Sequence, residues 1–280
     1  MEQHWTTIIK PKAKLLDLNL KEVWHYRDLI IMFVKRDFAT LYKQTILGPL
    51  WIILNPLMTT VIYNIVFGGI ASIPTDGMPS FIFYMAGNTV WTYFAACLNK
   101  TSTTFTANSA IFGKVYFPRL VMPISTIISG IINFFIQFVM FLGFMFFFMI
   151  RGSAIQPNLW ILLTPVLLIQ IGILGMGFGI IISSLTTKYR DLTVLVTFGV
   201  QLWMYASPVV YPISQIPSKW AGLLMLNPMA PILETFRYAY LGSGKVPVFY
   251  LCIGMILTLI VLFIGIVIFN RVEKTFMDTV

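Results

Sequence analysis

The side chains best suited to chemistry in this sequence are uncharged: indoles, phenols and carboxamides inside long apolar runs. Tyrosine and tryptophan offer a flat apolar face with one hydrogen-bonding edge, and such faces can hold sugar rings by stacking. The carboxamides of Asn55 and Asn64 are too costly to leave facing lipid, so we expect them to face protein or a wet path. For any single aromatic residue, core packing or anchoring at the membrane interface is the alternative. The residues that we group as a candidate path are Trp51, Asn55, Tyr63, Asn64, Gln201, Trp203, Tyr205 and Tyr211.

Ionisable side chains are scarce, and their scarcity excludes several chemistries. The chain has no G-x-x-x-x-G-K-[ST] phosphate loop with which to bind and hydrolyse ATP. His4 and His25 are too isolated for a metal site, so we predict neither a metal nor a catalytic residue. Ion-coupled carriers place ionisable residues at mid-membrane, and the apolar runs have none there. A membrane glycan transferase is a remote alternative, with Asp76 and Glu234 as its acids; Glu234 lies three residues before Arg237 and can pair with it.

These side chains must be positioned by helices that cross a membrane. Of the 280 residues, 58% are hydrophobic and 10% are charged, whereas soluble domains are about 25% charged. A hydrocarbon core of about 30 Å requires roughly 20 apolar residues per helix. Six runs qualify, and the sequence therefore predicts an all-α polytopic membrane protein with six transmembrane helices. The runs lie near 46–70, 81–98, 121–150, 159–185, 192–210 and 248–270.

Basic residues are distributed unevenly between the two sides of this topology. With the N-terminus in the cytoplasm, fifteen of the nineteen lysines and arginines lie inside. The four outside are Arg151, Lys219, Arg237 and Lys245. The positive-inside rule therefore predicts that both the N and C termini are cytoplasmic. The same rule explains most of the net charge of +9, so no nucleic-acid partner is expected.

Residues 21–44, before the first run, have the pattern of an amphipathic helix at the membrane interface. Apolar residues such as Tyr26, Ile30 and Phe33 recur at steps of three and four. Such a helix lies in the headgroup plane and is either an anchor or a mechanical collar on the first span, which begins at Gly48-Pro49. We divide the chain into a cytoplasmic N-terminal segment, the six-span domain and a cytoplasmic tail; these are 1–45, 46–270 and 271–280.

The stretch between the fifth and sixth runs is punctuated by prolines. Asn227 followed by Pro228 is typical of a helix start, and Gly242 suits the left-handed cap that ends a helix. A shorter helix, about 218–226, precedes this one. Both helices are too short to span and too apolar to stand free in water, so we expect two short re-entrant helices that dip back from the outer face.

Five segments in this order resemble a known family. They are LGPLWIILNP at 47–56, FPRLVMP at 117–123, KYRDL at 188–192, SPVVYP at 207–212 and NPMAPILETFRYAYLG at 227–242. On this topology the sequence resembles the transmembrane permease subunit of type-2 ABC exporters, specifically those that export O-antigen, capsule or teichoic-acid chains on a polyprenyl-linked lipid. The resemblance covers nearly the whole chain from residue 20 onward.

The resemblance implies an assembly in the bacterial cytoplasmic (inner) membrane. Two copies of this chain would form a homodimer and join two separate ABC ATPase subunits. ATP and Mg would bind to those subunits, so this chain is expected to bind no cofactor and to be no enzyme by itself. The cargo would be a polyprenyl-linked glycan, with O-antigen first and teichoic acid or capsule next; export of a lipid or drug-like cargo is the alternative.

The resemblance also assigns roles to residues. The candidate path would line a channel at the two-fold interface, formed by the first, second and fifth spans. An external re-entrant gate, 211–247, would close it through Tyr211, Pro212, Asn227, Pro228, Glu234 and Arg237. The loop around 107–116 would be the coupling helix on the ATPase, together with 188–191 and the N-terminal helix. The ATPase-coupling residues would be Asn108, Ser109, Phe112, Lys114, Tyr116, Lys188, Arg190 and Asp191.

Overall fold

The structure, a computed structural model, describes residues 20–43, 50–189 and 191–275. Some predictions fall outside the described residues. They concern 1–19, 44–49 (which include the predicted start of the first span at Gly48-Pro49), Arg190 and 276–280. In the described part every regular element is helical. In chain order the elements are α1 (Leu20–His25), α2 (Arg27–Lys43), α3 (Leu50–Tyr63), the π-helix η1 (Asn64–Ile70), α4 (Ser80–Ser102), α5 (Thr104–Ala107), α6 (Ser109–Phe112), α7 (Val121–Ile150), the 3-10 helix η2 (Leu159–Leu163), α8 (Thr164–Thr186), α9 (Leu192–Tyr205), the 3-10 helix η3 (Ile213–Gln215), α10 (Ser218–Met225), α11 (Met229–Leu241) and α12 (Val248–Thr275).

Five helices in the described part are long and apolar enough to cross a membrane: Leu50–Ile70, Ser80–Ser102, Val121–Ile150, Leu159–Thr186 and Val248–Glu273. The prediction of an all-α membrane protein is therefore confirmed at this level. The fifth predicted span, 192–210, is too long by five residues, because α9 ends at Tyr205. Pro208 follows and disfavours helical backbone in the residue before it. At 1.5 Å per residue, the 14 residues of α9 reach about 21 Å, so the six-span topology stays a prediction.

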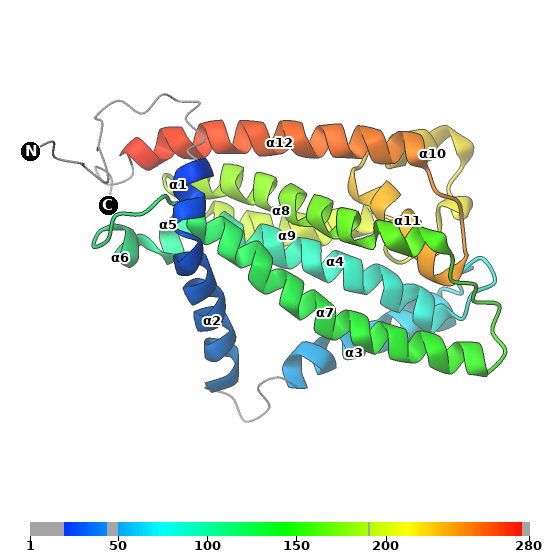
Figure 1. The fold of residues 1–280 in the computed structure, drawn as a ribbon. Helices are drawn as coiled ribbons and strands as arrows, with labels where there is room; N and C mark the ends of the chain where they lie inside the picture. The colour runs from blue at the N-terminus through cyan, green and yellow to red at the C-terminus, as the bar shows by residue number, and fades with distance from the viewer. Residues whose placement is uncertain (1–19, 44–49, 190, 276–280) are drawn as a thin grey trace, which may run out of the picture.

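The long helices run side by side and separate two sets of short elements (Figure 1). The helices α1, α5 and α6 lie at one end of the bundle with the last turns of α12, and we call this the α6 end. The helices α10 and α11 lie at the opposite end, the α10 end. The helix α2 crosses the direction of the long helices, as expected of a helix in the interface plane (Figure 1). Which end faces the cytoplasm remains the prediction of the positive-inside rule.

The centre of the bundle is α4, in which every residue from Ile82 to Trp91 is buried. It packs against α3, α7, α8, α9 and α11. Its approach to α8 is close because α8 presents glycines there. A Cβ added at Gly175 would come within 2.7 Å of the Cβ of Cys97. Small residues at such contacts let helix backbones approach and gain dispersion energy, which drives helix association inside a membrane.

Glycines also allow close packing between α8 and α12. A Cβ at Gly177 would lie 3.1 Å from the backbone nitrogen of Leu262, and a Cβ at Gly265 would lie 2.8 Å from the carbonyl oxygen of Gly177. The helices α4, α8 and α12 therefore form a tightly packed block. By contrast, α3 and α9 lie at its margin, and each buries only two residues.

A second apolar cluster fills the α6 end. Val23, Ile30 and Phe33 of the N-terminal helices are buried against Phe112, Phe117 and other residues of α5 to α8 and α12. The amphipathic pattern of 21–44 is thus confirmed over the described residues, with one break at Tyr26 between α1 and α2. The cluster fastens the N-terminal helices to the loop that follows α4.

Candidate functional site

Asn227 connects the end of α9 to the start of α11. Its Oδ1 accepts hydrogen bonds from the indole nitrogen of Trp203 at 3.2 Å and the backbone nitrogen of Met229 at 3.1 Å. Its Nδ2 donates to Ser207 Oγ at 2.8 Å and to the carbonyl of Ala206 at 3.2 Å. The predicted capping role of Asn227 is confirmed by the bond from Met229, and Gly242 has the left-handed backbone expected after α11, with φ of 79°.

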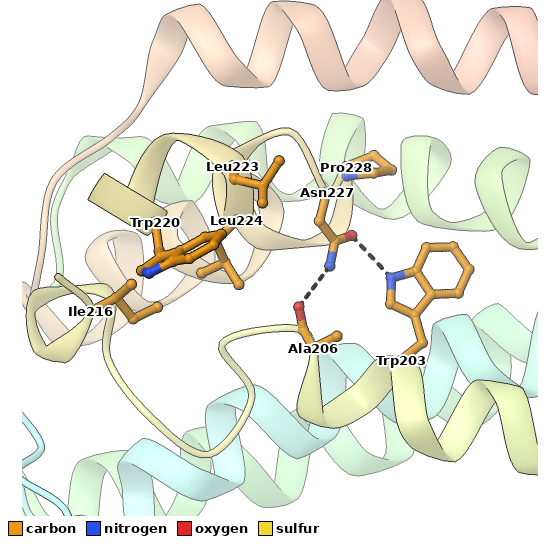
Figure 2. Close-up of a pocket in the computed structure, with 8 residues that line it drawn as sticks. All are labelled: Trp203, Ala206, Ile216, Trp220, Leu223, Leu224, Asn227 and Pro228. Carbon is orange, nitrogen blue, oxygen red and sulfur yellow. Dashed lines mark hydrogen bonds between the residues drawn. The ribbon is translucent and has the colours of Figure 1, made fainter. Parts of the chain in front are cut away.

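Figure 2 shows Asn227 at the edge of a pocket between α9 and α10. Its volume is about 430 Å³, and the lining is apolar apart from this carboxamide. The residues that line it are Trp203, Ala206, Ile216, Trp220, Leu223, Leu224, Asn227 and Pro228. Trp220 and Leu223 are exposed, as expected of a short helix that would rest in the bilayer surface.

Arg237 is buried at the α10 end and contacts several segments there. Its side chain is 1% exposed and donates to the carbonyl of Pro208 at 2.5 Å, to that of Tyr211 at 3.4 Å and to that of Val209. Its guanidinium carbon lies 3.8 Å from the ring centre of Phe83 on α4. Arg237 therefore fixes the loop after α9 to both α11 and α4, because it gives hydrogen bonds to loop carbonyls that lie outside any helix.

The predicted pairing of Glu234 with Arg237 is wrong, because no oxygen of Glu234 lies within ion-pair distance of the guanidinium. Burial raises the pKa of Glu234 from 4.5 to about 6, with Asp76 adding to the shift and Arg237 opposing it. Asp76 in turn accepts a hydrogen bond from Ser214 at 2.7 Å, which ties the loop before α4 to η3. Arg237 and Asp76 thus act on Glu234 through their charges and not through a direct ion pair.

The candidate path residues on α3 and α9 meet toward the α10 end. Tyr63 donates to the sulfur of Met204 at 3.1 Å, and Ser80 donates to Asn64 Oδ1 at 2.6 Å. Tyr211 donates to the carbonyl of Tyr205 at 3.0 Å, so the chain folds back directly after α9. These contacts hold α3, α4 and α9 together at the level where the short helices begin.

Trp203 is half-buried, and one part of its ring packs against neighbouring helices while another lines the pocket of Figure 2. Its ring packs edge-on against Phe94 of α4 and Phe178 of α8, each with ring centres 5.1 Å apart. Gln201 and Tyr205, on either side of it in the sequence, are exposed. Trp51 and Asn55 line a different cavity, between α3, α4 and α7. The structure therefore divides the predicted path residues into a packed member, an exposed pair and a separate group near the start of α3.

The predicted coupling loop exposes a short tip. Phe112 is 6% exposed and belongs to the cluster of the α6 end, so it holds the loop in place. Asn108 donates to the carbonyl of Thr104, and Ser109 donates to that of Thr106. Both side chains are half-buried, whereas Lys114, Val115 and Tyr116 are exposed. The longest exposed stretch of the loop is therefore 113–116, and Val115 was not among the predicted residues; Thr106, Ala107 and Ala110 are exposed as well.

Arg119 links this loop to the last turns of α12, a role that the sequence reasoning missed. It donates to the carbonyl of Glu273 at 2.6 Å and lies 3.7 Å from its carboxylate. The guanidinium also lies over the ring of Phe112, at 5.4 Å. Burial lowers the pKa of Arg119, and Glu273 opposes the shift. The arginine of FPRLVMP was visible, but its partner is 154 residues away.

The other predicted coupling residues lie at the same end. Thr186, the last residue of α8, donates to the carbonyl of Ser102 at 3.2 Å, which places the α8–α9 turn beside the end of α4. Lys188 and Asp191 are exposed in this turn. Across the described residues, no group of three histidines, cysteines or acids could hold a metal ion. The candidate sites are therefore an exposed loop surface at the α6 end and an apolar pocket at the α10 end.

Five helices long and apolar enough to cross a membrane, with short helices at both ends of their bundle, are the architecture of a membrane protein. The chain belongs to the ABC-2 type transporter family, whose model matches residues 28–241. It is 29% identical over 252 residues to the O-antigen export system permease protein RfbA of Klebsiella pneumoniae, covering 90% of this chain and 94% of the relative. It is 27% identical to RfbA of Myxococcus xanthus, covering 78% and 82%. It is 26% identical to the polysialic acid transport protein KpsM of Escherichia coli, covering 87% and 93%.

Proposed function

We propose that this chain is the channel-forming permease subunit of an ATP-driven exporter that moves polyprenyl-linked polysaccharide across the bacterial inner membrane, with O-antigen as the first cargo to test. The observation that carries the proposal is the similarity to an O-antigen export permease over 90% of the chain. The chain itself acts as a conduit and carries out no chemical step.

Polar side chains on the two marginal helices support a two-fold assembly. The helices α3 and α9 each bury only two of their fourteen residues, yet they expose Asn55, Gln201 and Tyr205. A carboxamide facing hydrocarbon without a hydrogen bond costs a few kcal/mol. A second copy of the chain, or a wet path between two copies, is the neighbour that fits these groups. We therefore propose a homodimer with α3 and α9 at its interface.

Energy enters through the α6 end in this proposal. Two separate ABC ATPase subunits bind ATP and Mg and dock on the exposed 113–116 tip and on the exposed Lys188 and Asp191. Lys114 and Tyr116 supply one charge and one aromatic surface. The buried Phe112 and the anchored Arg119 make the tip stiff, because both are fixed to other helices. A displacement of the tip then moves α1, α7 and α12 together.

The pathway is tested with Gln201→Leu and Tyr205→Ala combined in one variant, because Asn55 also lines a separate cavity. We expect polysaccharide at the cell surface to fall at least tenfold while the amount of protein in the membrane is unchanged. Export that is unchanged in this variant would show that these side chains face lipid and line no path, and it would refute the pathway. Phe135→Ala, at an exposed residue of α7, is the control and should export normally.

The coupling surface is tested with Lys114→Glu combined with Tyr116→Ala. We expect assembly in the membrane to persist, and stimulation of the partner ATPase to be lost. Lys219→Glu, at an exposed lysine of the α10 end, is the matched charge reversal and should leave stimulation at the wild-type level. Stimulation that survives in the tip variant would show that the energy enters elsewhere.

A further inference from the structure

A cavity of about 250 Å³ lies between α3, α4 and α7, away from the contacts described above. We call it the α3–α4–α7 cavity. Its polar lining consists of Asn55, Thr92, Tyr93, Lys100, Asn133 and Gln137. No acidic residue lines it. A cavity with one ammonium group, hydroxyl groups and three carboxamides, inside a bundle of apolar helices, is suited to a ligand that combines an anionic group with hydroxyl groups.

Two of the carboxamides are not satisfied by the protein. Asn133 and Gln137 are four residues apart, so they lie on the same face of α7. Asn133 Oδ1 and Gln137 Oε1 are buried without a hydrogen-bond partner, and the Gln137 side chain is 6% exposed. Buried polar groups nearly always have partners, and each exception requires an explanation. A ligand that brings its own polar groups into the cavity supplies one.

The mouth of the cavity lies toward the α6 end. Lys100 is two residues from the end of α4 and is exposed, and Trp51 is 54% exposed near the start of α3. Gln137 lies near the middle of the 30-residue α7, so the cavity extends from a charged, open rim into the apolar depth of the bundle. A phosphate at the rim can meet Lys100, while groups attached to it reach the carboxamides.

We propose that the α3–α4–α7 cavity binds the phosphate headgroup of the polyprenyl-linked cargo at the leaflet of the α6 end. The inference rests on the proposed function for the identity of the lipid. Lys100 binds a phosphate oxygen. Asn133 Oδ1 and Gln137 Oε1, which can only accept hydrogen bonds, accept them from hydroxyl groups of the first sugar attached to the phosphate. A volume of about 250 Å³ admits a headgroup and no long glycan, so the cavity holds the lipid end while the glycan enters the path.

The test measures binding of polyprenyl diphosphate that carries a single sugar to the purified permease in nanodiscs of uncharged lipid. We expect Lys100→Gln and Gln137→Leu each to weaken binding at least tenfold. Lys219→Gln and Gln215→Leu, both at exposed positions of the α10 end, are the matched controls and should bind as the wild type does. Gln137→Leu should also melt at an equal or higher temperature, because it removes an unsatisfied buried group, so weaker binding cannot be attributed to misfolding.

Competition identifies the source of the phosphate. Inorganic diphosphate and phosphatidylglycerol, each at tenfold excess, should displace less than half of the polyprenyl diphosphate. Full displacement by either would overturn the assignment to the cargo, and wild-type binding by both cavity variants would overturn the site. The proposed function is judged separately, by surface polysaccharide in a strain that lacks this chain. Loss of export in that strain with normal binding by both variants would refute the cavity alone, whereas intact export with the expected binding losses would refute the function alone.

Discussion

Replacement of Arg237 by methionine should release the loop that follows α9. Methionine keeps most of the apolar stem but removes every donor. The carbonyls of Pro208 and Val209 then lose close hydrogen bonds, and that of Tyr211 loses a longer one. Each buried acceptor left without a partner costs about 1–3 kcal/mol. The lost contact with Phe83 adds about 2 kcal/mol for a desolvated cation over a ring.

These losses are partly offset, because burying a guanidinium is costly and its Nε has no partner even in the wild type. We therefore expect the free energy of unfolding to fall by about 3–5 kcal/mol, the range found when one partner of a buried charged contact is removed. For a chain of this size such a loss lowers the melting temperature by about 10 °C. Arg237→Lys should recover only part of it, since one ammonium cannot reach three carbonyls in the geometry of a guanidinium.

The assay is thermal unfolding of the purified protein in detergent, combined with thiol labelling of a Val209→Cys reporter, buried in this loop, in a Cys252→Ser background. Arg151→Met is the control, because Arg151 is exposed and lies 4.5 Å over a phenylalanine ring at the end of α7. It should change stability by less than about 1 kcal/mol. If Arg237→Met also stays within that limit and the reporter is labelled no faster, Arg237 does not hold the loop.

Three further predictions concern single contacts. Gly87→Ala should destabilise the protein by about 1–3 kcal/mol, since its Cβ would lie 2.5 Å from the carbonyl oxygen of Val209. Gly143→Ala, with open space around it, is the control and should be neutral or stabilising. Equal unfolding midpoints for the two variants would contradict the close packing at Gly87. Arg119→Gln should cost about 1.5–3 kcal/mol and expose the end of α12 to protease, and an unchanged cleavage pattern would exclude the link. The pKa of Glu234 is raised when folded, so the wild type loses stability as the pH rises from about 4.5 through about 6. Glu234→Gln should therefore gain about 2 kcal/mol on the wild type between pH 4 and pH 8, and a pH-independent difference would show that the carboxylate is not desolvated.

Features governed by neighbours in the sequence could be predicted. Asn227 caps α11 and Gly242 ends it because a cap depends on the three or four residues around it. The apolar stripe of the N-terminal helix was readable for the same reason, since helical periodicity is a local property. The long spans follow from hydropathy alone.

Features governed by distant partners could not be predicted. Helical spacing placed Glu234 beside Arg237, but the arginine binds carbonyls 26–29 residues away that only the folded loop presents. Phe112 has the type and position of a docking residue, and its burial depends on helices from both ends of the chain. Asn133 and Gln137 are single polar residues in a long apolar run, and their shared cavity needs α3 and α4 to exist. Tertiary packing decides each of these cases.

The glycine contacts between α8 and α12 have a mechanical meaning. Gly177 and Gly265 bring the two backbones so close that neither helix can slide along the other without a clash. The two helices should therefore move as one rigid body. At one end of α12, Glu273 contacts Arg119. At the other end, α12 begins shortly after Gly242, where α11 ends. Under the proposed docking of an ATPase at the α6 end, a tilt imposed there would be passed along the two helices to the α10 end, with little of it absorbed by bending between the ends.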